Sequence, residues 1–121
     1  MSEWDLKKRT KEFAHRSVKL VISLQGNTLG NHLAKQLIRS STSVAANYRA
    51  ACVAQSQASF TAKISIAYEE CDESYFWIEF VQDENLINKD RVLPLLKEAD
   101  ELTRILASSR KTSSKSVKGK R

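Results

Sequence analysis

Basic side chains recur at helical spacing near the start of the sequence. They form a stripe in which Lys8, Lys11, His15 and Lys19 fall within about 80° of one another around a helix, with Arg16 at its edge. A row of cations on one helix face suits phosphate groups, because each phosphate that is neutralised releases bound counterions. The spacing therefore predicts a surface that binds RNA or DNA.

Further basic residues extend this predicted surface along the chain, and six of them lie in residues 108–121, which contain no acidic residue. A basic segment that only keeps a protein in solution would have the same composition. No helix-turn-helix, zinc-finger or aromatic sheet pattern predicts that the bases themselves are read. The remaining residues assigned to nucleic-acid binding are Lys35, Arg39, Arg49, Arg110, Lys111, Lys115, Lys118, Lys120 and Arg121.

Catalytic and metal-binding chemistry finds little support in the sequence. The two histidines, His15 and His32, fall on different predicted elements, and there is neither a nucleophile elbow nor a glycine-rich phosphate loop. Glu70 and Glu73 have the i, i+3 spacing used in di-iron bundles, but no histidine follows either of them, as such a site requires. We therefore expect no enzyme activity, no metal and no cofactor.

The two cysteines indicate a reducing compartment. Cys52 and Cys71 lie inside helical patterns and are expected to be small apolar side chains with free thiols. No apolar run approaches the roughly 18 residues that a membrane span needs, and the acidic start of the chain is unlike a secretion signal. The sequence therefore predicts a cytoplasmic protein with no membrane contact.

Charge is distributed unevenly along the chain. Residues 1–54 carry nine Lys and Arg against three Asp and Glu, whereas residues 55–107 carry five against eleven. Such asymmetry favours either a nucleic-acid partner or subunits that pack a basic face against an acidic one. Two solvated faces that happen to differ in charge remain the alternative interpretation.

The elements that must position these residues are long and few, because three glycines and one proline leave little material for turns. Apolar residues at helical spacing predict an all-α fold, an antiparallel up-down four-helix bundle formed by residues 1–107. A disordered basic tail is predicted for residues 108–121, which hold a single aliphatic side chain. The four helices are expected at residues 5–25, 31–54, 57–83 and 89–107, the second in the centre because it is rich in small residues.

One segment of the third predicted helix has apolar side chains nearly all the way round. A helix of that kind must be covered on more than one side. The bundle core can cover one side, and another subunit or a partner must cover the other. The residues predicted to form this oligomer interface are Tyr75, Phe76, Trp77 and Phe80.

Two polar residues fall close to the predicted core. Asn47 lies among small residues of the second helix, and Glu73 lies near the core edge of the third. A hydrogen bond between them would fix the register of the two helices. We therefore expect a structural role for this pair.

Residues 33–51 carry a pattern that resembles a known family. Its core is Leu-x-Arg-x-x-x-Ser-(Ile/Val)-x-x-Asn, matched here by Leu37, Arg39, Ser43, Val44 and Asn47, and further along by Phe60, Ala67 and Glu73. The chain is similar over residues 6–107 to the bacterial four-helix-bundle proteins first noted as reading frames inside intervening sequences of 23S ribosomal RNA genes. It also resembles, more distantly, the accessory variability proteins of diversity-generating retroelements.

The resemblance implies an up-down bundle that assembles as a ring-shaped homopentamer. In the retroelement relatives, a basic surface of the ring is thought to engage nucleic acid together with a reverse transcriptase. The chain departs from the common pattern at Ala50-Ala51, where many members have Glu-Gly, and at Glu69-Glu70, where many have Gly-Ser. Our leading hypothesis is an oligomeric, nucleic-acid-binding accessory or scaffold protein. The alternative is a protein–protein adaptor with no nucleic-acid role.

Overall fold

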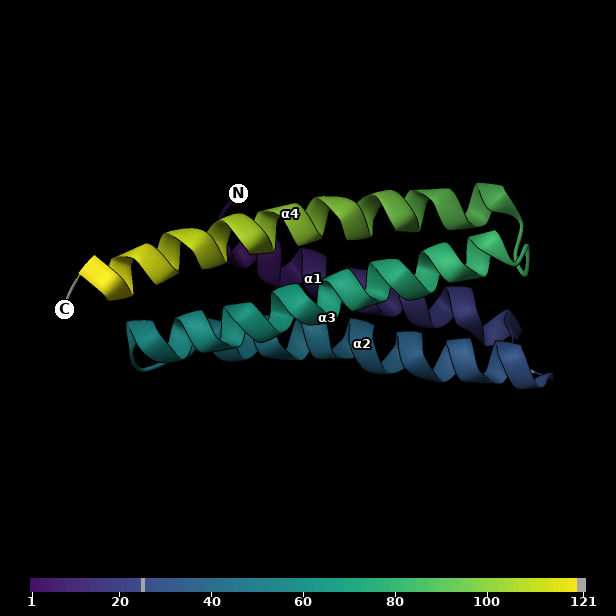
Figure 1. Ribbon diagram of the computed structural model, residues 1–121, viewed down its shortest axis with the longest axis horizontal. Coiled ribbons are helices and arrows are strands. Elements are labelled where there is room, and N and C mark those ends of the chain that lie inside the picture. Colours follow the sequence, from purple (N-terminus) through teal and green to yellow (C-terminus); the bar gives the residue numbers. More distant parts are fainter. Residues whose placement is uncertain (25, 120–121) are drawn as a thin grey trace.

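The structure is a computed structural model that describes the backbone of residues 1–24 and 26–119 and the side chains of residues 1–24 and 26–115 (Figure 1). None of the described residues forms a strand, which confirms the predicted all-α fold. No helix in this part of the chain is both long and apolar enough to cross a membrane. The elements in order are α1 (Glu3–Val21), the short 3-10 helix η1 (Ile22–Leu24), α2 (Thr28–Cys52), α3 (Gln57–Asp83) and α4 (Lys89–Gly119).

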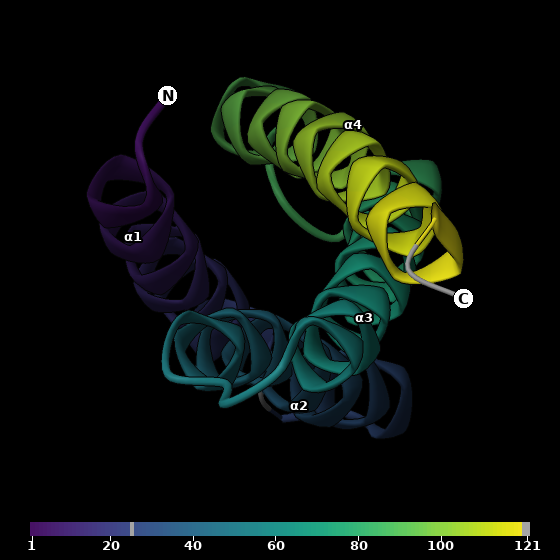
Figure 2. The same cartoon turned by 90° about the vertical axis from the view of Figure 1, so that its left-hand side faces the viewer.

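The four helices run antiparallel and follow one another in space in chain order. Viewed end on, they lie along an arc, with α1 and α4 at its two ends (Figure 2). Helix α2 packs against α1 and α3, and α3 packs against α2 and α4, whereas α1 and α4 touch each other less. The second helix is therefore an inner helix, as its small residues predicted, and it shares this place with the third.

Side-chain caps set where each helix begins. Ser2 caps α1, because its Oγ accepts a hydrogen bond from the backbone N–H of Asp5 at 3.1 Å, while the carboxylate of Asp5 accepts one from the N–H of Ser2. The hydrogen bonds from Ser2 hold the pKa of Asp5 below its usual range. Helix α1 consequently begins at Glu3, two residues earlier than expected, and Ser56 caps α3 as predicted.

The connection between α1 and α2 depends on two glycines. Gly26 has a φ of +117°, a backbone conformation that L side chains rarely adopt. Asn27 caps α2 by accepting a 2.7 Å hydrogen bond from the N–H of Gly30, so the helix begins at Thr28 instead of residue 31. A Cβ on Gly30 would lie 1.9 Å from the carbonyl oxygen of Leu24, which explains why a glycine is needed inside this first turn.

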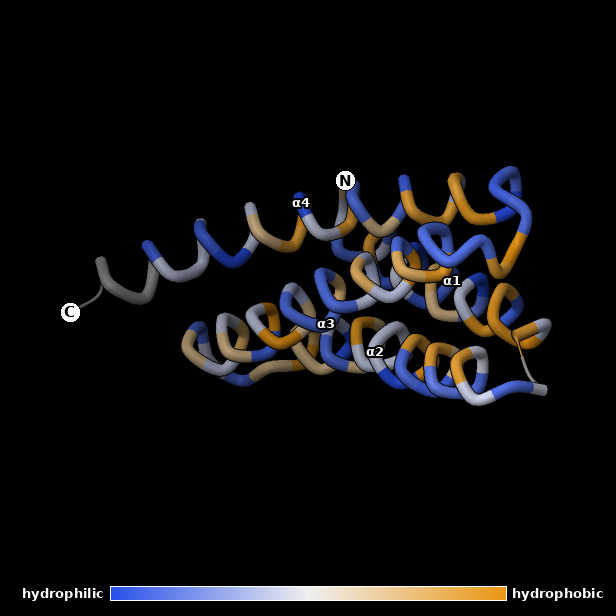
Figure 3. Tube along the Cα trace, turned by 45° about the vertical axis from the view of Figure 1, so that its right-hand side comes forward, coloured by the Kyte–Doolittle hydropathy of each residue, from blue (hydrophilic) through white to orange (hydrophobic). Residues whose placement is uncertain are grey.

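The core follows the predicted apolar stripes, and hydrophobic positions of the four helices face one another along the bundle (Figure 3). Small hydroxyl side chains interrupt it at mid-length, where the Oγ of Ser74 donates a 2.8 Å hydrogen bond to the Oγ of Ser40. Within the described residues, the buried Oγ of Ser17 has no hydrogen-bond partner. The large side chains that are fully buried are Phe13, Leu33, Leu37, Ile64, Ile78, Leu102 and Leu106.

Helix α4 is longer than the sequence predicted. It continues past residue 107 to Gly119 and reaches beyond the turn between α2 and α3 (Figure 1). The prediction of a disordered segment from residue 108 missed contacts made by hydroxyl groups: Ser113 is buried, accepts a 2.6 Å hydrogen bond from Nε2 of Gln57 and contacts the hydroxyl of Thr61. These contacts dock the extension on α3 without any apolar side chain.

Candidate nucleic-acid interface

A shallow groove runs between α1 and α2 on the outside of the bundle. It consists of two adjoining hollows of about 270 and 280 Å³ that share Lys11 and Ala45. Alanine at positions 45 and 46 leaves the space between the two helices open. We call this feature the α1–α2 groove; its residues are Lys7, Lys11, Ala14, His15, Val18, Thr42, Ala45, Ala46 and Arg49.

The groove brings together three of the basic residues that the sequence assigned to nucleic-acid binding. Lys11 and His15 come from α1, and Arg49 comes from α2, where its spacing from the other basic residues gave no hint of proximity. Lys7 also lines the groove but was missed, because it falls outside the stripe seen on the helical wheel. Lys8 lies exposed on the same helix.

Three other predicted residues lie outside the groove. Lys35 lines a separate hollow with Ile38 nearer the start of α2. Arg16 and Lys19 line a hollow on the other side of α1, shared with Asp90 and further residues of α4. The predicted basic surface is therefore split, and only part of it forms a continuous groove.

Arg39 is engaged in holding the bundle together. Its guanidinium pairs with Glu70 at 2.8 Å and with Glu73, both on α3. Burial alone would lower the pKa of Arg39, but the hydrogen bonds to these carboxylates outweigh it and raise that pKa. Two of the residues by which the chain resembles the family, Arg39 and Glu73, thus meet as an ion pair between α2 and α3.

Arg9 makes the corresponding connection between α1 and α4. Its Nε and Nη2 donate 2.7 Å hydrogen bonds to the two carboxylate oxygens of Glu98, and Nη2 also contacts Glu101 at 2.7 Å. The hydrogen bond to Glu98 raises the pKa of the Arg9 guanidinium. Bidentate pairs of this kind fix geometry as well as charge.

The other cations of α1 and α2 have no such partners. Among the side chains that the structure describes, Arg9 and Arg39 are the only cations of α1 and α2 that form ion pairs. Helix α3 carries exposed carboxylates instead, such as Asp72, Glu79 and Asp83. The cations that remain free for a ligand within this described region are Lys7, Lys8, Lys11, Arg16, Lys19, Lys35 and Arg49.

The predicted polar pair of the core does not form. The Nδ2 of Asn47 donates to the backbone oxygen and to the hydroxyl of Ser43, one turn earlier on the same helix. Glu73 instead pairs with Arg39 and accepts a 3.0 Å hydrogen bond from Nε1 of Trp77. The prediction of an Asn47–Glu73 hydrogen bond is wrong, because Asn47 bonds within its own helix and Glu73 is engaged by Arg39 and Trp77.

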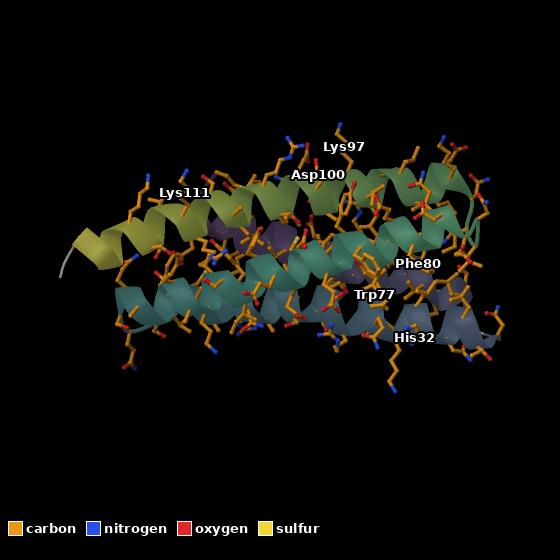
Figure 4. All side chains as sticks on the ribbon, viewed as in Figure 1. His32, Trp77, Phe80, Lys97, Asp100 and Lys111 are labelled. Carbon is orange, nitrogen blue, oxygen red and sulfur yellow. The ribbon has the colours of Figure 1, made fainter. Side chains whose placement is uncertain are left out.

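An aromatic cluster marks the outer side of α3. The ring of Trp77 packs edge-to-face on His32 of α2 at 5.6 Å and on Phe76 at 4.9 Å, and Phe80 lies 6.0 Å from Phe76 (Figure 4). Phe76 is 50% exposed, whereas Tyr75, Trp77 and Phe80 are half-buried. The segment is thus covered on its inner side and open on its outer side.

The basic residues of the α4 extension are placed unevenly. The guanidinium of Arg110 lies over the ring of Tyr68, 5.4 Å from its centre. Lys111 projects from the outer side of α4 (Figure 4), and Lys115 is exposed. The side chain of Lys118, together with residues 120 and 121 (the predicted Lys120 and Arg121), lies outside the described part of the chain.

The described residues offer little for catalysis. No group of three or more His, Cys, Asp or Glu side chains among them could hold a metal ion. Burial raises the pKa of Cys71 to about 11 and also raises that of Cys52, so both thiols stay protonated at neutral pH. The hollows of about 270 to 340 Å³ are at the lower end of the size range of ligand pockets.

Comparison with known proteins identifies relatives of the chain. The family described as 23S rRNA-intervening sequence protein matches residues 2–108. A crystal structure of a protein of unknown function from the S23 ribosomal protein family of Bacteroides thetaiotaomicron is similar, with 33% identity and a TM-score of 0.79 over 88% of this chain and 98% of that one. No curated protein matches the sequence. Both matches confirm the resemblance to the proteins of 23S ribosomal RNA intervening sequences.

Proposed function

Since the chain belongs to the 23S rRNA-intervening sequence protein family, we propose that it is a nucleic-acid-binding accessory protein that holds RNA or DNA along the α1–α2 groove. The observation that carries the proposal is the row of cations along the groove that no carboxylate of the described residues neutralises. The family description names an intervening sequence of ribosomal RNA, which accords with a nucleic-acid partner.

The groove has dimensions that suit a phosphate backbone. The residues of α1 that line the groove run from Lys7 to Val18, a separation of 11 residues or about 16 Å at 1.5 Å per residue. That length corresponds to about five phosphates of a B-form strand. Lys7, Lys11 and Arg49 would contact phosphates, while Ala14 and Val18 offer an apolar floor for sugars or bases.

The acidic surface of α3 would influence how a nucleic acid approaches the protein. The exposed carboxylates of α3 repel a polyanion, so a nucleic acid approaching the protein is steered toward α1 and α2. Binding, in this proposal, is the whole activity of the protein, and no chemical step is assigned to it.

We propose that assembly into a homo-oligomer accompanies this function. Phe76, half exposed within the aromatic cluster of α3, supports self-association, because large aromatic side chains are enriched in interfaces. The resemblance of residues 33–51 implies a ring of five subunits, which would repeat the groove around the assembly. Replacing Phe76 by Glu should then reduce the mass measured by light scattering to that of the monomer, while an unchanged mass would exclude this interface.

The nucleic-acid proposal is tested by binding of fluorescent RNA and DNA across a salt series. For the full chain we expect affinity to fall steeply with salt. The double variant Lys11→Glu with Arg49→Glu should reduce the steepness of the log–log plot by about two contacts. The matched control is Lys89→Glu with Lys97→Glu on α4, which makes the same change of charge away from the groove and should bind nearly as the unaltered chain does.

Two outcomes would count against the proposal. Absence of binding by the full chain near physiological salt would exclude it and leave a protein–protein adaptor as the better interpretation. Equal losses in the groove variant and in the α4 control would show that only net charge matters, and that the groove is not the site.

A further inference from the structure

The two tryptophans of the chain have opposite surroundings. Trp77 is half-buried, packs on His32 and Phe76, and donates its Nε1–H to Glu73. Trp4 is 71% exposed, and within the described residues its indole has neither a ring partner nor a hydrogen bond. Indole rings bring a large apolar area to interfaces, so an indole this exposed is available to stack on a ligand.

Trp4 stands in line with the cations of α1. Spacings of four, three and four residues connect Trp4, Lys8, Lys11 and His15, which therefore share one face of the helix. Lys7, which follows Trp4 by about one helical turn, lines the groove itself. The indole thus lies at one end of the row of cations that flanks the α1–α2 groove.

The last turn of α2 lies at the same end of the groove, because α1 and α2 pack antiparallel and the end of α2 meets the start of α1. Arg49, one turn before Cys52, lines the groove opposite Lys7. A strand that leaves the groove between Lys7 and Arg49 therefore passes next to Trp4.

The first turn of α1 presents the indole in a fixed position. Ser2 and Asp5 form a reciprocal cap that holds this turn, and the carboxylate of Asp5 is occupied by that cap. The cations Lys7 and Lys8 follow the indole by three and four residues on the same helix, an arrangement suited to a base on the ring and its phosphates on the lysines.

We propose that Trp4 stacks on an unpaired base of the nucleic acid held in the α1–α2 groove, and that this contact makes the site prefer single strands. The inference rests on the proposed function and adds a specificity to it. A duplex keeps its bases stacked on one another, so it can offer phosphates to the lysines but no free base face to the indole.

The test compares a single-stranded RNA with a duplex of the same length. Trp4→Ala should weaken single-strand binding by about 10- to 100-fold and leave duplex binding within about twofold, with the salt dependence of both unchanged. Trp4→Phe should retain most of the single-strand affinity, because it keeps an aromatic face. The matched control is Val53→Ala, which trims an exposed apolar side chain near the same end of the bundle and should change neither affinity.

Fluorescence gives an independent readout. In a Trp77→Phe chain Trp4 is the remaining tryptophan, and its emission should be quenched by the single strand but not by the duplex. Equal losses on both nucleic acids, or no loss with Trp4→Ala, would overturn the inference while leaving groove binding in place. Absence of binding by the unaltered chain would instead refute the proposed function.

Discussion

The α1–α2 pair and the α3–α4 pair have similar interiors, and the exposed charge of α1 and α2 is opposite to that of α3. Both pairs bury leucine, valine and small side chains against the same core. On the outside, α1 and α2 present seven cations without an ion pair among the described residues, whereas α3 presents carboxylates around an aromatic cluster. Packing therefore requires neither pattern, and the difference between the two surfaces is the basis of the proposed nucleic-acid site.

Two arginines show where charge does serve the fold. Arg9 and Arg39 are the cations of α1 and α2 that reach across to the acidic helices, and each contacts two glutamates. They connect α1 to α4, at the two ends of the arc, and α2 to α3, at its centre. The other basic residues of these two helices differ from them because they form no ion pair with a carboxylate of the described residues.

The largest expected effect is a loss of stability of the α1–α2 pair, caused by substitutions in the segment that connects the two helices. Gly30→Ala places a Cβ against the carbonyl oxygen of Leu24, and we expect it to lower the free energy of unfolding by about 3 kcal/mol. Gly26→Ala meets no neighbouring atom and only strains its own backbone, so it should cost about 1 kcal/mol. Urea denaturation of both variants checks the order, which would be wrong if the two changes cost the same.

A smaller effect should come from cutting the two arginine connections. Arg9→Ala leaves Glu98, whose side chain is 14% exposed, without its partner and should lower the free energy of unfolding by about 2 kcal/mol. Arg39 is 49% exposed, so Arg39→Ala should cost about 1 kcal/mol. The two losses should add in the double variant, since the two ion-pair clusters share no residue.

The same variants separate structural from ligand-binding cations. Nucleic-acid affinity should stay within about threefold for Arg39→Ala, because that guanidinium is already occupied. A loss of affinity as large as that of the Lys11 and Arg49 double variant would show that Arg39 belongs to the binding surface.

The smallest effect should come from neutralising the acidic exterior. Changing Asp72 and Asp83 to Asn and Glu79 to Gln removes repulsion of a polyanion, and we expect affinity to rise about threefold at low salt. The gain should vanish near 1 M salt, where charges are screened beyond about 3 Å. Stopped-flow association rates check this, and a gain that persists at high salt would mean that these residues touch the ligand.

Helical periodicity predicted the architecture well, and the misses concern contacts that hydropathy does not register. The bounds of α3 were predicted in full, because Ser56 and the apolar stripe agree. Helix α2 begins earlier than expected, since Gly30 lies inside the helix and allows its backbone to approach the carbonyl oxygen of Leu24. Helix α4 ends later because Ser113 docks through hydroxyl contacts.

The binding surface was harder to predict, because it depends on two helices at once. Spacing along α1 found Lys11 and His15, but nothing in the sequence showed that Arg49 would face Lys7 across a groove. Spacing also could not reveal that Arg39 is occupied by glutamates 31 and 34 residues away. Trp4 had a detectable signal, its position one turn before Lys8, although aromatic residues at helix ends are common enough to be passed over.

The overhang of α4 affects how copies of the protein must be counted in solution. Its 31 residues span about 46 Å, against about 28 Å for the 19 residues of α1. An elongated particle experiences more friction than a sphere of equal mass and elutes early from a gel-filtration column. Elution volume therefore overstates the number of subunits, and the stoichiometry of any assembly has to come from light scattering or sedimentation equilibrium, which measure mass independently of shape.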